Sequence, residues 1–261
     1  MSPFPRGFGK GLLAGGAAAA LWWALSDQRR RTAIVDQVVD RVEASPFPGS
    51  RIHALLPEQL TGDIHRAVAE DVVSEARTGG LLEIGSGPGY LAMEIGRRAR
   101  DLQNTTMDRS PGVVRGAESR IHASGLGRQV KVALGDVLDI PFPDESFDFV
   151  LSLGSLHHWR APDLVFDEIY RVLKPGGRAW IYDLRRETPE TDWEEIRRGV
   201  PPIMRPLFEL GAIGSWRAAY TDGQIRDVVA SSPFSQAEIG ALTVETAGRR
   251  APALTKVTLR K

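Results

Sequence analysis

The sequence contains no cysteine among its 261 residues. This absence excludes disulfides, thiolate metal sites, iron–sulfur clusters and covalent catalysis through a cysteine thiolate. It also excludes attachment to a membrane through a lipid-modified cysteine. The chemistry of the chain therefore depends on oxygen and nitrogen side chains, on main-chain groups or on a bound cofactor.

The sequence also lacks an excess of charge of either sign. Lysine and arginine together number 33, aspartate and glutamate together number 33, and the formal net charge is zero. Because no net positive field is available to hold a polyanion, nucleic acid is not an expected partner. Hydrophobic residues make up 42% and charged residues 25% of the chain. These values are typical of a soluble globular domain, here with room for an accessory segment.

Long hydrophobic runs are scarce, and the notable one lies near the start of the chain. Residues 11–25 read GLLAGGAAAALWWAL, with Arg6 and Lys10 before them and the basic run 29–31 after them. A helix of this length covers about 22 Å at roughly 1.5 Å per residue, less than the roughly 30 Å hydrocarbon layer of a bilayer. Three interpretations are open: a short or interfacial anchor, a cleaved signal peptide, and a helix that packs on the domain.

The basic residues after this run bear on where the protein resides. If residues 11–25 enter a bilayer, the cluster at 29–31 favours a cytoplasmic location for everything that follows. We therefore expect a cytoplasmic protein, attached to the cytoplasmic face of the membrane if the run inserts. A proline- and glycine-rich stretch, SPFPGS at 45–50, then predicts a boundary between an extension (1–50) and a domain (51–261).

The domain reads as alternating helices and strands. Apolar residues repeat every four positions from about Thr61 to Arg77, which predicts a helix. Five short apolar or β-branched runs then alternate with segments of helical length, and this alternation predicts an α/β fold with a doubly wound, mostly parallel sheet. The expected strands are Leu81–Ile84, Thr105–Met107, Val130–Leu134, Phe147–Leu151 and Arg178–Tyr182. Two further runs, Ala237–Thr246 and Ala253–Arg260, have no helix between them and predict an antiparallel hairpin that closes the sheet.

A glycine-rich turn follows the first expected strand. The segment LLEIGSGPGY runs from an apolar strand into Gly85, Gly87 and Gly89, and a helix begins near Tyr90. Glycines at a strand-to-helix turn let the main chain approach a ligand closely, so we expect a bound nucleoside here. The dinucleotide pattern G-x-G-x-x-G requires glycine where this chain has Tyr90. An NAD-dependent oxidoreductase is therefore disfavoured.

An acidic residue followed by alternating glycines, from Glu83 to Gly89, resembles the first motif of the class I S-adenosylmethionine-dependent methyltransferases. Further landmarks follow in the order that this family shows. They are Asp108 in MDRSP, Asp136 in LGDV, Phe147–Val150, Glu168–Gly177 and Trp180–Asp183. The resemblance covers about residues 81–184 and points to the ubiquinone and menaquinone methyltransferase-like branch. It implies a seven-stranded Rossmann-like sheet.

The resemblance also implies how the cofactor is held. Asp108 would accept hydrogen bonds from the ribose hydroxyls, and Asp136 with Val137 would contact the adenine. The methionine end would lie against Glu83 and nearby main-chain groups. The implied cofactor-binding residues are Glu83, Gly85, Ser86, Gly87, Gly89, Asp108, Arg109, Asp136, Val137 and Ser152. The expected cofactor is S-adenosyl-L-methionine and the expected product is S-adenosyl-L-homocysteine.

Few side chains need to be catalytic, because the methyl group of a sulfonium is already activated. His157 is the candidate general base, since an imidazole takes up and releases protons near neutral pH. The alternative is that His157 only packs or caps a helix. The residues expected to line the acceptor are His158, Trp159, Tyr182, Asp183 and Arg185. No metal is expected, because the histidines and acids do not have a ligand spacing that requires one.

The sequence restricts the class of the methyl acceptor but does not identify the acceptor. The segment SLGS at 152–155 lacks the Asn/Asp-Pro-Pro-aromatic signature of enzymes that methylate the exocyclic amines of bases. Residues 185–220 are rich in large apolar side chains and form either a lid over the acceptor or ordinary helical core. A lid together with residues 11–25 favours a hydrophobic, quinone- or lipid-like acceptor. Two alternatives stay open: a methyltransferase that acts on a soluble small metabolite, and a catalytically inactive, cofactor-binding regulatory protein. The sequence does not indicate the oligomeric state.

Overall fold

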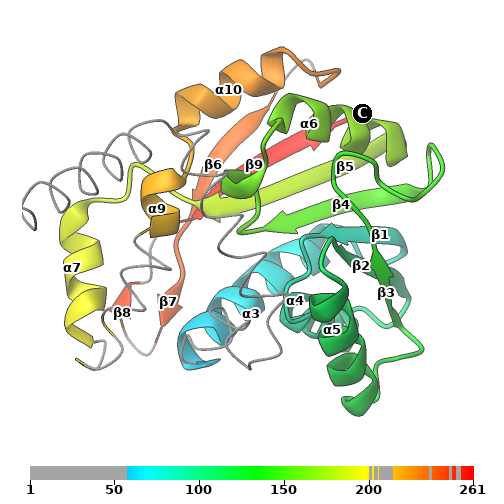
Figure 1. Cartoon of the computed structure of the whole chain (residues 1–261), viewed down its shortest axis with the longest axis horizontal. Helices are drawn as coiled ribbons and strands as arrows, with labels where there is room; N and C mark the ends of the chain where they lie inside the picture. The colour runs from blue at the N-terminus through cyan, green and yellow to red at the C-terminus, as the bar shows by residue number, and fades with distance from the viewer. Residues whose placement is uncertain are drawn as a thin grey trace, which may run out of the picture.

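The computed structural model describes residues 58–199, 202, 205, 214–234, 237–246, 249–250 and 254–261 (Figure 1). The extension expected at residues 1–50, with the apolar run at 11–25, lies outside these ranges. No helix within the described ranges has the length and apolar character that crossing a membrane requires.

A seven-stranded sheet forms the centre of the molecule, in the order β3-β2-β1-β4-β5-β9-β6 (Figure 1). The first five strands along the chain are parallel, and β9 runs antiparallel between β5 and β6. This arrangement confirms the Rossmann-like fold. The strands are β1 (Gly79–Ile84), β2 (Leu102–Asp108), β3 (Val130–Leu134), β4 (Phe147–Leu153), β5 (Leu173–Leu184), β6 (Glu238–Leu242) and β9 (Leu254–Arg260).

Helices cover both faces of the sheet, as the alternating pattern predicts (Figure 1). On one face, α3 and α4 pack Val68, Val72 and Leu91 against Leu81 and Trp180, and α5 packs beside α4. On the other face, α6 and α10 bury their apolar sides in a second core. The helices are α3 (Glu58–Glu75), α4 (Tyr90–Arg98), α5 (Pro111–Ala123), η3 (Leu156–His158), α6 (Pro162–Val172), α7 (Glu190–Gly199), α9 (Gly214–Ala218) and α10 (Asp222–Ala230).

Local sequence explains where several of these helices begin. The Ser110 side chain accepts a hydrogen bond from the Val113 N–H, and Pro111 occupies the first turn of α5. Helix α10 begins with a capping box, in which Thr221 and Gln224 satisfy each other's main-chain N–H groups. Both helices therefore start at positions that their own residues specify.

The C-terminal hairpin is confirmed, with one addition. Strands β6 and β9 pair antiparallel, with Gly240 opposite Lys256. The connection between them carries a separate two-stranded sheet, β7 (Glu245–Thr246) and β8 (Arg249–Arg250), which the sequence pattern did not predict. Strand β5 is also longer than expected, because Leu173 pairs with Phe147 across a register shift before the regular pairing begins.

Candidate functional site

The carboxyl ends of the parallel strands meet at one edge of the sheet, where an open α/β fold binds its ligands. The loop after β1 crosses the end of β2 at this edge. The N–H groups of Gly85 and Ser86 both donate to the Met107 carbonyl, each at 2.9 Å. The glycine turn and Asp108 at the end of β2 are thereby held next to each other.

The three glycines of this turn are required for different physical reasons. Gly85, Gly87 and Gly89 all have positive φ, at 77°, 47° and 81°, which side chains disfavour. A Cβ at Gly85 would also collide with the Ser155 hydroxyl, whereas a Cβ at Gly87 would meet nothing within 4 Å. Gly154, after β4, has φ of 66° and faces open space in the same way. The main chain is therefore exposed to a ligand at Gly87 and Gly154.

Asp108 is tied to the glycine turn. Its Oδ2 accepts a hydrogen bond from the Gly87 N–H at 3.1 Å, and its Oδ1 accepts one from the Ser110 N–H at 3.0 Å. Burial raises the pKa of the Asp108 carboxyl, and these main-chain hydrogen bonds offset only part of the increase. Main-chain N–H groups of Gly87, Ser110 and Arg109 occupy three of the four lone-pair positions of the carboxylate, which leaves one for the hydroxyl of a ligand.

The loop after β3 brings Asp136 to the same edge. The Gly135 N–H donates to the Asp108 carbonyl at 3.0 Å, which links this loop to the end of β2. Asp136 is exposed, and its Oδ1 accepts a hydrogen bond from the Leu138 N–H at 3.0 Å. The next residue, Val137, packs partly against the core. The three acidic residues that the sequence singled out therefore belong to three adjacent strands: Glu83 lies near the end of β1, Asp108 ends β2 and Asp136 follows β3.

Glu83 lies beneath the glycine turn and is 2% exposed. Its Oε2 accepts a hydrogen bond from the Thr106 hydroxyl at 2.8 Å. Burial raises the pKa of Glu83 to about 8, with a small further contribution from Asp108 and opposition from the Thr106 hydrogen bond. A cationic group brought to this position would favour the ionised carboxylate.

His157 and Asp183 form a buried pair, at 5% and 3% exposure. The Nδ1 atom of His157 lies 2.7 Å from Asp183 Oδ1, and the main-chain N–H of His157 donates to Oδ2 at 2.8 Å. Burial alone would raise the pKa of Asp183, but the neighbouring His157 and the hydrogen bonds that Asp183 accepts hold it below its ordinary value. Asp183 is therefore an ionised acceptor that fixes the Nδ1–H tautomer of His157 and leaves a lone pair on Nε2.

The Nε2 atom of His157 is buried and has no hydrogen-bond partner among the described residues. Buried polar atoms in proteins are nearly always paired, so an exception requires an explanation. This nitrogen belongs to η3, which follows β4 at the carboxyl edge of the sheet. A hydroxyl proton of the methyl acceptor would give this nitrogen a hydrogen-bond partner.

Two residues expected to line the acceptor lie elsewhere. Trp159 belongs to the apolar core and contacts Phe166 edge to face, with ring centroids 5.7 Å apart. Tyr182 is fully buried on the opposite face of β5, and its hydroxyl donates to Asp71 of α3 at 2.6 Å. Tyr182 and Asp183 are consecutive in a strand and therefore point to opposite faces, so Asp183 can meet His157 while Tyr182 contacts Asp71.

The remaining residues expected at the site have their own partners or neighbours in the structure. Arg185 forms an ion pair with Asp222 at 2.8 Å, so its charge is already balanced. Ser152 is buried, and its hydroxyl donates to the Ile84 carbonyl at 3.1 Å, joining β4 to β1. His158 adjoins His157, with ring centroids 4.0 Å apart. Arg109 is exposed beside Asp108.

Sequence reasoning missed the side chains that support this site. Thr106 holds Glu83 and Ser155 packs against Gly85. Asp183 was expected to line the acceptor, but its role in holding His157 was not predicted. A signal existed for Asp183, because residues at the carboxyl ends of adjacent strands become neighbours once the strand order is known. Thr106 and Ser155 have no comparable signal, since each is an ordinary polar residue in its segment.

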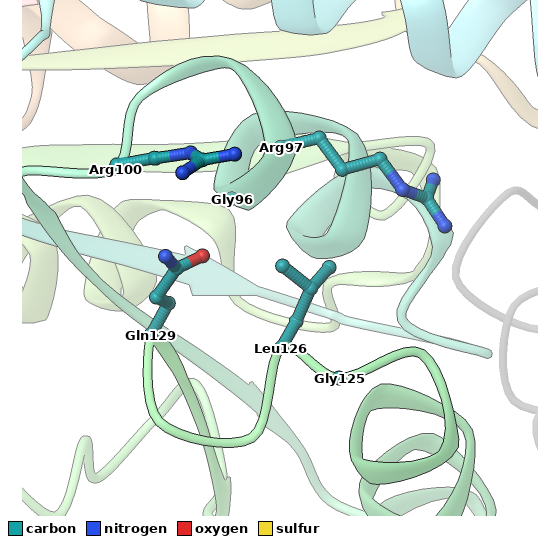
Figure 2. Close-up of a pocket in the computed structure, with 6 residues that line it drawn as sticks. All are labelled: Gly96, Arg97, Arg100, Gly125, Leu126 and Gln129. Carbon is teal, nitrogen blue, oxygen red and sulfur yellow. The ribbon is translucent and has the colours of Figure 1, made fainter.

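A surface hollow lies away from this edge, between the end of α4 and the turn before β3 (Figure 2). Figure 2 shows Arg100 and Gln129 approaching each other across it, while Arg97 points away. The lining contains no residue of the glycine turn and neither member of the His157–Asp183 pair. Within the described part of the chain, no group of three or more His, Asp or Glu side chains is arranged to hold a metal ion.

Comparisons with known proteins agree with this geometry. Residues 82–181 match the family model described as a methyltransferase domain. The chain is 28% identical over 133 residues to a ubiquinone/menaquinone biosynthesis C-methyltransferase of Dinoroseobacter shibae, covering 49% of this chain and 53% of that protein. It is 32% identical over 121 residues to a fatty-acid O-methyltransferase of Mycolicibacterium smegmatis, covering 46% of this chain and 43% of that protein.

The matched region is thus about half the length of these curated relatives or less. Among solved structures, an S-adenosylmethionine-dependent methyltransferase from Aquifex aeolicus superposes with a TM-score of 0.57 at 20% identity, covering 82% of this chain and 98% of that one. This likeness supports the fold.

Proposed function

We propose that this chain, whose residues 82–181 match a methyltransferase domain, transfers a methyl group from S-adenosylmethionine to a hydrophobic, oxygen-bearing acceptor. The proposal rests on two groups of residues that lie at the same edge of the sheet. One is the glycine turn with Asp108 and Glu83, and the other is the His157–Asp183 pair.

The residues present fit the cofactor. Gly87 and Gly154 face open space, so a ligand can lie against the main chain there. Asp108 and Asp136 offer oxygens for a ribose diol and an adenine amine, and Glu83 offers a carboxylate for a cationic amine. When bound, S-adenosylmethionine supplies an activated methyl group on a sulfonium. The protein itself supplies binding, alignment and removal of a proton.

His157 is the group that removes the acceptor proton. Asp183 holds the ring by its Nδ1–H, so the ring cannot rotate without breaking this hydrogen bond. The main-chain N–H of His157 donates to the other carboxylate oxygen and fixes the carboxylate in place. The lone pair of Nε2 then takes the proton of an acceptor hydroxyl as that oxygen becomes nucleophilic. The developing imidazolium is stabilised by the Asp183 carboxylate.

A hydrophobic acceptor is supported by the relatives and by the segment after β5. One relative is named for quinone biosynthesis and another for fatty acids. In the segment expected to form a lid, Trp193 and Trp216 are buried against each other, with ring centroids 5.5 Å apart. Figure 1 shows α9, which carries Trp216, beside the carboxyl end of β5. An apolar wall at this edge suits an apolar acceptor.

We also propose that residues 11–25 bring the enzyme to the cytoplasmic face of a membrane. The uncharged run and the basic residues after it support this proposal. A hydrophobic acceptor dissolved in a bilayer would then be concentrated near the site.

The test of the proposed function begins with calorimetric titration of S-adenosylmethionine into the full chain and into Asp108→Ala. We expect micromolar binding that is lost in the variant. Transfer of a radiolabelled methyl group is then measured with a prenylated hydroquinone, a long-chain fatty acid and a water-soluble phenol. Transfer to the soluble phenol alone would favour a soluble metabolite, and binding without any transfer would favour a regulatory protein. A folded wild type that does not bind the cofactor would overturn the proposal.

A further inference from the structure

We infer that the acceptor site contains a cluster of hydrogen-bond donors, formed by Arg186, Thr188 and Trp216, that binds an anionic or carbonyl oxygen of the acceptor and discriminates against amines. This inference rests on the proposed function, because it assigns the acceptor class of the same site. It concerns the segment immediately after β5 and helix α9.

Arg186 is a partly buried cation without an acidic partner in the described part of the chain. Its neighbour Arg185 is paired with Asp222 at 2.8 Å, so the two arginines differ in electrostatic state. The Arg186 guanidinium lies over the Trp216 ring, with Cζ 5.0 Å from the ring centroid. A contact with an aromatic face leaves the five N–H donors in the guanidinium plane available to an oxygen ligand.

Two further polar groups are buried, one on the ring that Arg186 covers and one two positions along the chain. Trp216 is 7% exposed and Thr188 is 4% exposed. The indole N–H of Trp216 and the hydroxyl of Thr188 have no hydrogen-bond partner among the described residues. Thr188 follows Arg186 by two positions, and its main-chain N–H closes a turn onto the Arg185 carbonyl at 3.1 Å. Since buried polar groups are normally satisfied, these donors indicate that an oxygen-rich ligand belongs here.

The donor cluster lies close to the proposed base. Asp183, which holds His157, precedes Arg186 by three residues, and an extended chain spans at most about 3.5 Å per residue. The main chain at Arg186 is therefore within roughly 10 Å of that at Asp183. We therefore expect an acceptor of modest size to span the distance from Nε2 of His157 to the donor cluster.

The donor cluster determines which acceptors bind. The positive charge of Arg186 repels an ammonium group. The indole N–H of Trp216 can only donate, so it cannot accept a hydrogen bond from an ammonium group. The same groups pair well with a carboxylate, an ionised phenol or a quinone carbonyl. The nucleophile that faces His157 is then an oxygen, or a carbon next to such an oxygen, and not an amine.

The experiment compares three probes that share one apolar chain: octanoate, octan-1-ol and octylamine. Their binding to the full chain is measured by calorimetry and by tryptophan fluorescence, with and without saturating S-adenosylhomocysteine. We expect octanoate to bind at least tenfold more tightly than octylamine. Arg186→Gln should abolish this preference, and Trp216→Phe, which keeps the aromatic ring and removes the N–H, should weaken octanoate binding severalfold.

Arg217→Gln is the matched control, because Arg217 is exposed on α9 next to Trp216 and its loss changes the net charge by the same amount as the loss of Arg186. This variant should keep the wild-type preference. Should Arg186→Gln fail to fold, Arg186→Lys replaces it, since lysine keeps the charge and loses the planar donor fork.

Equal binding of octylamine and octanoate by the wild type would overturn the inference, as would an unchanged preference in Arg186→Gln. S-adenosylhomocysteine binding is recorded on the same samples. If S-adenosylhomocysteine binds but octanoate is not preferred, the donor cluster is contradicted and the proposed function is not. If S-adenosylhomocysteine does not bind, the proposed function is contradicted.

Discussion

Gly85 and Ser155 are packed so closely that a single methyl group at position 85 would collide with the Ser155 hydroxyl. These residues follow β1 and β4, which are adjacent strands. The contact therefore joins the turn expected to hold the cofactor to the segment that carries His157. A change at Gly85 should affect both halves of the site.

Gly85→Ala should lower the free energy of unfolding by about 3 kcal/mol, from overpacking and from φ of 77°. Urea unfolding measures this loss. Adding Ser155→Gly should recover most of the steric part and leave about 1 kcal/mol of backbone strain. Gly125→Ala is the control, since φ is 78° there with nothing within 4 Å of its Cβ, and it should lose only the strain. A double variant as unstable as Gly85→Ala would contradict the steric explanation.

Glu83→Gln should stabilise the ligand-free protein while it abolishes cofactor binding. The folded-state pKa of Glu83 is raised from 4.5 to about 8, so the folded state holds a proton that the unfolded state releases. Wild-type stability from this group therefore falls as pH rises from about 4.5 to about 8. Glutamine has no proton to lose, so the variant should be more stable by roughly 4 kcal/mol near pH 8 and little different near pH 4.5.

Urea titrations at several pH values between 4.5 and 8 measure this difference. Thr106→Val is the companion variant, because it removes the hydrogen bond to Glu83 and keeps the carboxyl. A constant difference between Glu83→Gln and wild type across the pH range would show that Glu83 does not titrate in this window.

Asp183→Asn should reverse the tautomer of His157. An asparagine amide in place of the carboxylate can donate to Nδ1, so the ring proton moves to Nε2 and the base is lost. Nitrogen-15 NMR of histidine-labelled protein should show an unprotonated Nε2 in the wild type and a protonated Nε2 in the variant. Methyl transfer should fall by about 100-fold or more, while the Kd for S-adenosylmethionine stays unchanged.

The same pair affects stability at low pH. The pKa of Asp183 is held below its ordinary value, so its ionised form stabilises the folded state above the unfolded-state pKa, and this contribution is lost as pH falls through the lower folded-state value. Asp183→Asn should therefore unfold less steeply with acid than the wild type. An unchanged NMR signature in Asp183→Asn would mean that another group sets the tautomer.

Removal of residues 1–31 should abolish binding to membranes without loss of cofactor affinity. The deleted stretch contains the uncharged run 11–25 and the basic residues that follow it. Flotation with vesicles of neutral and anionic phospholipid measures the binding, and calorimetry with S-adenosylmethionine provides the control. Flotation of the shortened chain equal to that of the full chain would assign membrane contact to another part of the protein.

Much of the fold follows from local sequence. Apolar runs of strand length alternate with helical segments, and each strand-to-helix turn carries its own signals, such as Ser110 with Pro111 before α5. These features act over a few residues, so they can be read without knowledge of the partners. The cofactor half of the site follows in the same way, because its glycines and acidic residues lie at or directly after the ends of β1, β2 and β3.

The catalytic half could not be derived in this way. His157 and Asp183 are 26 residues apart and meet because β4 and β5 are adjacent in the sheet. Trp159 and Tyr182 look equally suited to the site in the sequence, yet both are buried elsewhere.

The sequence by itself determined the order of elements and the nucleoside-binding turn, since both depend on short-range pattern. Only the tertiary structure decided which side chains face one another, because that choice depends on strand order and on the alternation of side chains across a strand. Asp183 therefore reaches His157, while Tyr182, one residue earlier, reaches Asp71 on the opposite face.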